Sequence, residues 1–163
     1  MRNQLEKTIL RFLLVFGIVT FFNLIRKPPV KDWLIIFLIK GYISSILDKL
    51  LVRKGYIDYP VKLFKSFDIS FIFDYLLFPV TCVYFNQFTK ASTLPGIIAK
   101  LFAFSIPMAI IEHILEKKTK LISFKKGWNT YRSFITVNIT FILVRILIGV
   151  IRKADNTPVP ENR

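Results

Sequence analysis

The chain has 163 residues, of which 53% are hydrophobic, with a mean hydropathy of +0.51 and a formal net charge of +14. A soluble domain of this size is usually less apolar, and a nucleic-acid-binding protein would need a solvated basic face. Here the Lys and Arg residues mostly flank long apolar blocks, where they meet anionic lipid headgroups. The composition therefore argues against a nucleic-acid partner and predicts an all-α, polytopic helix bundle with the lipid bilayer as its solvent.

The apolar blocks set the expected number of membrane crossings. A membrane-spanning helix needs about 20 mostly apolar residues, and the blocks lie at residues 8–25, 33–52, 69–88, 94–115 and 131–151. The first block ends at Pro28-Pro29 with no small-x-small cleavage site, so we read it as a retained span rather than a signal peptide. We expect about five transmembrane helices in one domain over residues 1–152, followed by a polar, disordered tail at residues 153–163.

The second block is the most polar of the set. Lys40, Ser44 and Asp48 follow one another at intervals of four residues, which places them on one face of a helix. Gly41 and Ser45 lie beside this face and permit close helix packing. The pattern predicts a helix whose polar stripe is turned toward protein.

The segment that follows, residues 53–67, is too short and too charged to cross a bilayer. We expect a loop and a short helix lying in the headgroup region. The third and fourth blocks contain Pro79 and Pro107, each of which is expected to kink its helix and free a carbonyl group.

The loop charges predict an orientation. Lys and Arg residues are more numerous in the loops on the side of the N-terminus than in those on the opposite side. The positive-inside rule then places the N-terminus in the cytoplasm and the C-terminus outside, provided that the second block crosses.

This topology sorts the charged residues of the blocks into two layers. Those expected near the cytoplasmic side are Arg11, Asp48, Asp74, Glu112, His113, Glu116 and Arg132, and those expected near the outer side are Lys40, Lys100 and Arg145. Charges at membrane depth usually face the bundle interior and are paired. The first layer is therefore the candidate intramembrane polar site, and the second is the candidate site for an anionic lipid.

Asp74 and Glu112 are the sharpest candidates, because each lies within an apolar helix at similar expected depth. One hypothesis is a proton or cation site built from these carboxyl groups, with His113 as a further member. The alternative is structural: Arg11 or Arg132 neutralises the acids and locks the helices in place. For the outer cations, the alternative to a shared lipid site is that each side chain snorkels independently.

No motif predicts an enzyme, a cofactor or a metal site. Cys82 is the single cysteine, and Glu112-His113 lacks the second histidine of a zinc-protease helix. Glu116 and Lys120 are spaced for an ordinary surface ion pair.

Several short strings together resemble a known family. They are Gly55-Tyr56-Ile57-Asp58-Tyr59-Pro60-Val61-Lys62, Ser70-Phe71-Ile72-Phe73-Asp74-Tyr75, Phe78-Pro79, Cys82-Val83-Tyr84-Phe85-Asn86, Glu112, Leu115-Glu116-Lys117 and Trp128. Over residues 55–145 the chain resembles a family of small multi-pass membrane proteins from Bacillus, Clostridium and related spore-forming bacteria. The resemblance implies a bacterial cytoplasmic-membrane protein with an acid at Asp74, and it supplies no reaction, substrate or cofactor.

Two main functions follow as hypotheses. The chain is an accessory membrane component that binds a membrane-protein partner or a second copy of itself, or it is a small transporter or channel component with an acidic site at Asp74 and Glu112. A weaker third hypothesis is binding of anionic lipid through Lys40, Lys100 and Arg145. A water-accessible cavity beside Asp74 would favour transport, whereas an arginine paired with Asp74 would exclude it.

Overall fold

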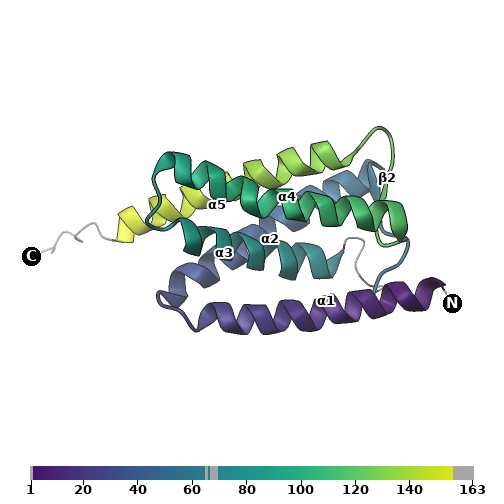
Figure 1. Cartoon of the computed structure of the whole chain (residues 1–163), viewed down its shortest axis with the longest axis horizontal. Coiled ribbons are helices and arrows are strands. Elements are labelled where there is room, and N and C mark those ends of the chain that lie inside the picture. The colour runs from purple at the N-terminus through teal and green to yellow at the C-terminus, as the bar shows by residue number, and fades with distance from the viewer. Residues whose placement is uncertain (1, 65, 67–69, 156–163) are drawn as a thin grey trace, which may run out of the picture.

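Long helices make up most of the computed structural model, which describes residues 2–64, 66 and 70–155 (Figure 1). The helices are α1 (Arg2–Ile25), α2 (Val30–Arg53), α3 (Phe78–Thr89), α4 (Leu94–Lys118) and α5 (Thr130–Asp155). A π-helical turn, η1 (Phe73–Leu77), leads directly into α3, and the short strands are β1 (Ile57–Asp58) and β2 (Ser123–Phe124). The predicted all-helical fold is confirmed for these residues.

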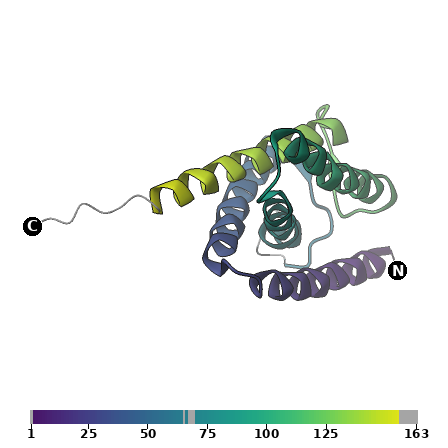
Figure 2. The same cartoon turned by 60° about the vertical axis from the view of Figure 1, so that its left-hand side comes forward.

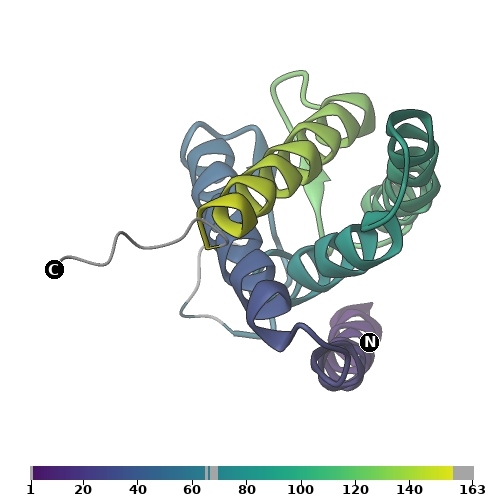
Figure 3. The ribbon, with the colours of Figure 1, turned by 90° about the vertical axis from the view of Figure 1, so that its left-hand side faces the viewer.

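Helix α2 is central to the packing. It contacts α1, α3, η1, α5 and β1, while α4 packs against α3 and α5 (Figures 2 and 3). The main core contains the fully buried side chains of Leu24, Ile36, Phe85, Phe141 and Val144. Because each helix brings residues to this core, the elements enclose a common interior in which a site can form.

Three of the described helices are long and apolar enough to cross a membrane: Gln4–Ile25 within α1, all of α4 and all of α5. Most of their apolar side chains are not buried inside the protein; Phe12 of α1 and Ile139 of α5, for example, are 69% and 61% exposed. Such an outer surface suits lipid rather than water. The other two predicted crossings are not confirmed, because α2 carries Lys40, Asp48 and Lys49 and α3 alone is short.

The short interfacial helix predicted within residues 53–67 is wrong for the part that the structure describes. Gly55 has a φ of +72°, a left-handed conformation that ends α2 at little cost. Residues 54–64 are then non-helical, and β1 pairs antiparallel with β2, Ile57 opposite Phe124 and Asp58 opposite Ser123. Pro60 also disfavours a helix here.

Pro79 explains the π-helical turn. A proline has no N–H to donate to the carbonyl four residues earlier, and the turn before it widens so that the Phe78 N–H bonds to the Phe73 carbonyl instead. The result is a helix over residues 71–89 with a bulge that contains Asp74. Pro107, in contrast, lies inside an uninterrupted α4.

The prediction that the polar tail begins at residue 153 is also wrong at its start, because α5 continues to Asp155. Two ion pairs hold this end against the start of α2: Arg152 to Asp32 and Lys31 to Asp155, both at 2.6 Å. Residues 156–163 lie outside the described part of the chain.

Candidate functional site

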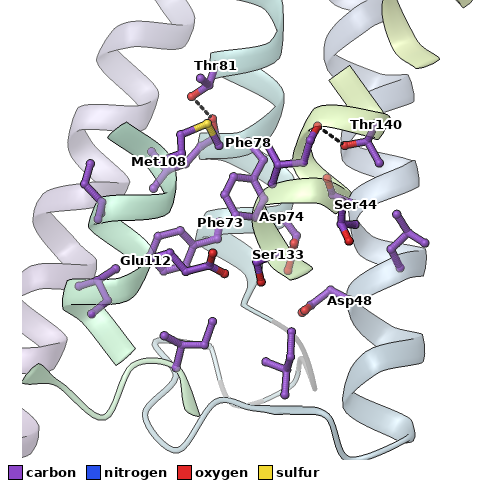
Figure 4. Close-up of a pocket in the computed structure, with 18 of the residues that line it drawn as sticks. Ser44, Asp48, Phe73, Asp74, Phe78, Thr81, Met108, Glu112, Ser133 and Thr140 are labelled. Atoms are coloured by element: carbon purple, nitrogen blue, oxygen red, sulfur yellow. Dashed lines mark hydrogen bonds between the residues drawn. The ribbon is translucent and has the colours of Figure 1, made fainter. Parts of the chain in front are cut away.

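A cavity of about 240 Å³ lies inside the bundle (Figure 4). All five α-helices and η1 contribute to its wall, and Ile57, Tyr59, Ile122 and Trp128 close one end. These four residues belong to residues 54–64 and 119–129, which are joined by the β1–β2 pairing and are here called the cap. The polar residues that line the cavity are Lys40, Ser44, Asp48, Tyr59, Asp74, Thr81, Glu112, Ser133, Thr136 and Thr140.

The polar stripe of α2 forms one wall. Lys40, Ser44 and Asp48 are all buried, at 2%, 6% and 7% exposure, and all line the cavity, as expected for residues spaced four apart on one helix. Gly41, beside this stripe, faces Pro79 and the Asp74 carbonyl oxygen: a Cβ there would lie 3.5 and 3.9 Å from them, at ordinary van der Waals distance. The α2 stripe therefore lies directly against the bulge of η1.

The Lys40 ammonium is held inside the cavity wall. Its Nζ donates a hydrogen bond to Thr140 Oγ1 of α5 at 2.8 Å. It also lies 5.8 Å from the ring centroid of Phe78 and 5.4 Å from that of Phe141, distances at which an aromatic face attracts a cation. Desolvation of this ammonium is thus partly offset by a hydroxyl and two aromatic rings.

Asp48 and Asp74 form a carboxyl pair. The two side chains lie within hydrogen-bonding reach of each other, and Tyr59 donates its O–H to Asp48 Oδ1 at 2.7 Å. The Oδ2 atom of each aspartate is buried and receives no N–H or O–H donor from the described residues. Two carboxyl groups in such contact disfavour each other's ionisation, so we infer that the pair holds one proton between them.

Glu112 is the third carboxyl group of the cavity. It is hydrogen-bonded to Ser133 of α5, whose hydroxyl also accepts the indole N–H of Trp128 at 3.0 Å. Figure 4 shows Glu112, Asp74 and Asp48 directed toward one region, with Ser133 among them. The described lining of the cavity therefore contains three carboxyl groups and a single ammonium group, that of Lys40.

The other residues of the predicted acidic layer lie elsewhere. Arg11 and Arg132 are exposed and do not line the cavity, so the prediction that one of them neutralises Asp74 is wrong. His113 is exposed, with Nδ1 3.1 Å from Thr130 Oγ1. Glu116 lies 3.3 Å from Lys117, instead of forming the predicted pair with Lys120.

The three cations assigned to the outer layer do not make one site. Arg145 donates to the hydroxyl and carbonyl oxygens of Thr89 at 2.6 and 2.8 Å, and Lys100 donates to the Phe88 carbonyl oxygen at 2.8 Å. Both therefore serve the C-terminal carbonyl groups of α3, where cations are favourable. Lys40 lines the acidic cavity instead, which corrects both its predicted layer and the predicted shared headgroup site.

Tyr59, Ser133 and Trp128 are site residues that the sequence analysis missed. Tyr59 and Trp128 lie in the cap, outside every apolar block, and Ser133 lies in the first turn of α5. Their only local signal is that a tyrosine, a tryptophan and a serine carry hydrogen-bonding groups. The contacts of Tyr59 with Asp48 of α2 and of Ser133 with Glu112 of α4 depend on tertiary packing, so local sequence patterns do not reveal them.

The cap carries an ion pair of its own on the outside. Lys125 Nζ lies 2.8 Å from Asp58 Oδ2, with both side chains about half exposed. The hydrogen bond from the Lys125 ammonium lowers the pKa of the Asp58 carboxyl below its usual value. The stabilisation from this pair is thus complete at neutral pH and is lost as the pH falls through the lowered pKa of Asp58.

We expect Asp58→Asn to reduce stability by less than about 1 kcal/mol, because solvent screens an exposed pair. The measurement is thermal unfolding in detergent at neutral and acidic pH. The difference between wild type and variant should shrink toward acidic pH, and a growing difference would contradict the assigned ion pair.

Comparisons of the chain with protein-family models, with curated proteins and with solved structures find no match. The chemistry of the site therefore has to carry the functional argument. Among the described residues, no group of three His, Cys, Asp or Glu side chains is arranged to hold a metal ion.

Proposed function

We propose that this chain is a small, proton-linked transporter of the bacterial cytoplasmic membrane, in which all five helical segments cross the bilayer and the cavity binds solute and protons in turn. The observation that carries the proposal is the Asp48–Asp74 carboxyl pair, which lies at the wall of a cavity and has no arginine partner among the described residues. Intramembrane carboxyl groups of this kind are typical of proton relays in transporters.

Helix dimensions support five crossings. The continuous helix at residues 71–89, which joins η1 to α3, has 19 residues and is thus about 28 Å long, close to the thickness of the hydrocarbon core. Helix α2 has 24 residues, and it turns Lys40 and Asp48 inward, away from lipid. The described ends of α1 and α5, at Arg2 and Asp155, lie at opposite ends of the bundle, as an odd number of crossings requires (Figure 1).

The charge distribution supports a cytoplasmic cap. Lysines gather at the cap and at the adjoining ends of α2 and α4; they are Lys54, Lys62, Lys117, Lys118, Lys120, Lys125 and Lys126. The positive-inside rule favours this end as the cytoplasmic one. The carboxyl pair would then lie nearer to the cytoplasm than to the outside, with the cap between it and water.

Proton exchange by the pair depends on all the groups that face it. Among the described residues, the titratable groups near the pair are those of Lys40 of α2, Tyr59 and Lys62 of the segment after β1, and Glu112 of α4. The lining residues of α5 add only hydroxyl and apolar groups, and those of α1 add Leu13 and Phe16. With one proton shared, the pair carries a single negative charge that the Lys40 ammonium balances, so a further charge change requires a proton or a ligand.

The accessory function predicted from the sequence remains a hypothesis. It needs an outer surface that is built for a protein partner, yet the exposed faces of α1, α4 and α5 carry the apolar residues that lipid alone requires. The cavity and its buried carboxyl pair, in contrast, cost stability, and a functional site is a reason to keep them.

The test uses the proton itself as the probe. Purified protein in liposomes adsorbed on a capacitive electrode should give a transient current when the bathing solution is switched from alkaline to acidic pH. Asp74→Asn and Asp48→Asn should each reduce this current severalfold, since an amide cannot take up the proton. Asp58→Asn is the matched control, because it removes an acid outside the cavity, and it should leave the current unchanged.

Equal currents in Asp74→Asn, Asp48→Asn and the control would overturn the proposal. Loss of current counts only for variants that keep the wild-type elution volume in detergent and the wild-type helical circular dichroism. The asparagine replacements should leave the fold intact, because an amide nearly matches the carboxyl in shape and supplies an N–H donor to the remaining carboxylate.

A further inference from the structure

The lining of the cavity specifies a class of ligand. Apart from its polar groups the wall is apolar, and it includes aromatic residues on different elements: Phe16, Phe73, Phe78 and Trp128. A cavity of about 150 Å³ holds a benzene molecule, so about 240 Å³ has room for a ring with a short side chain. A ligand of this size would place an apolar body against the aromatic wall.

Charge decides the head group of such a ligand. The described lining provides the carboxyl groups of Asp48, Asp74 and Glu112 against one ammonium group. An anion would meet this acidic excess without a free cation to pair with, because Lys40 already bonds Thr140 and faces two aromatic rings. A cation, in contrast, would complete the charge balance when the acids give up protons.

Lys40 shows that this interior accommodates a primary ammonium group. Its side chain is an alkylammonium tethered to α2, buried to 2% exposure between a hydroxyl and the rings of Phe78 and Phe141. The region around Glu112 offers a comparable environment, with a carboxyl group, the Ser133 hydroxyl and the indole of Trp128. Aromatic faces combined with a carboxylate are a favourable setting for a small organic cation.

The cavity also reaches the outer surface of the bundle. Phe16 of α1 and Ile111 of α4 line it, yet they are 52% and 54% exposed. Helices α1 and α4 lie apart when the bundle is viewed along its axis (Figure 3). In a membrane-embedded protein, this edge of the cavity faces the lipid tails rather than water.

We propose that the cavity binds a small apolar monoamine as its ammonium ion, that the amine enters from the bilayer between α1 and α4, and that its binding releases a proton from the Asp48, Asp74 and Glu112 cluster to water. This inference rests on the proposed transport function and names its substrate class. An ammonium ion and a proton compete for the same negative charge, which is the physical basis of exchange.

The first test compares three ligands that share a phenylalkyl group and differ in the charge of the head group. Calorimetric titration of the wild-type protein in detergent would use 2-phenylethylammonium, the neutral 2-phenylethanol and the anionic 3-phenylpropionate. We expect the ammonium to bind about tenfold or more tightly than the alcohol, a factor that corresponds to about 1.4 kcal/mol, and the propionate not to bind. The apparent enthalpy should vary with the ionisation enthalpy of the buffer, because protons are released. Equal binding of the ammonium and the alcohol would overturn the inference.

The second test locates the site and its entrance. Asp74→Asn and Glu112→Gln should each weaken binding of the ammonium about tenfold, whereas Asp58→Asn should not.

Ile111→Trp should narrow the edge of the cavity and slow association of the ammonium, measured by stopped-flow fluorescence. Phe12→Trp is its control, because Phe12 is exposed on α1 and does not line the cavity. Equal association rates in these tryptophan variants would overturn the lateral entrance.

The two proposals fail separately. Proton-driven currents without a preference for the ammonium would refute the monoamine and leave the proton-linked transporter intact. Binding of the ammonium that releases no proton, in a protein that gives no current, would refute proton-linked transport and the proposed proton release, and would leave the monoamine site itself intact.

Discussion

Replacing Lys40 by methionine is expected to destabilise the protein by about 3–5 kcal/mol at neutral pH, the range found when one partner of a buried charge pair is removed. Lys40 is the one ammonium among the described residues that line the cavity, and it balances the charge of the Asp48–Asp74 pair. Without it, the pair either stays charged in an apolar interior or takes up a second proton. The loss of stability should therefore be much smaller at acidic pH, where that proton is supplied.

Thermal unfolding in detergent across a pH series measures this effect. Lys49→Met is the matched control, since Lys49 is an exposed lysine on the same helix, and it should change stability little at any pH. A double-mutant cycle adds Asp74→Asn. In that background Lys40→Met should cost less, because the introduced amide and Tyr59 both donate to Asp48. An additive cycle, or a cost independent of pH, would rule out Lys40 as the counter-charge of the pair.

The second large effect is expected at Gly17, where α1 packs on η1. A Cβ at this position would lie 2.5 Å from Leu76 Cδ2, 2.7 Å from Leu76 Cγ and 3.3 Å from Leu77 Cδ2. Gly17→Ala should thus cost about 1–3 kcal/mol by overpacking, although alanine is the better helix former. It should also displace α1, which contributes Leu13 and Phe16 to the cavity wall.

Gly149 of α5 offers the matched control, because a Cβ there would meet nothing within 4 Å. Gly149→Ala should leave thermal stability unchanged or raise it slightly, as expected for an exposed helical glycine. Adding Leu76→Ala to Gly17→Ala removes the colliding side chain, so the double variant should lose less than the sum of the single variants. A destabilisation by Gly17→Ala no greater than that by Gly149→Ala would refute the tight α1–η1 contact.

The sequence was most informative where a pattern repeats within one helix. The interval of four residues between Lys40, Ser44 and Asp48 predicts a shared face, and the structure turns that face to the cavity. The inference failed for Lys40 when depth was used instead: the predicted layers place it apart from Asp74, yet both line one cavity. Gly41, the residue after Lys40, lies beside the Asp74 carbonyl oxygen, so the packing of the helices brings Lys40 and Asp74 to a similar depth, which counting residues from the ends of the blocks did not predict.

The cap shows a different limit of sequence reasoning. Residues 53–67 contain no periodicity that predicts pairing with residues 123–124, and a short helix was expected there. The β1–β2 pairing joins segments more than 60 residues apart and brings Tyr59 and Trp128 to the end of the cavity. Such contacts depend on how the helices pack, which no local pattern encodes.

Composition and periodicity by themselves determined that this is an all-helical chain with an apolar exterior, since hydropathy and helical spacing are local properties of the sequence. They also singled out Asp48, Asp74 and Glu112 as acids in apolar surroundings. Only the tertiary structure decided which charges meet. Pro79 widens the turn that contains Asp74, and α2 packs against that turn at Gly41. The carboxyl pair arises from that approach, because a shared proton depends on distances between helices rather than on spacing along one of them.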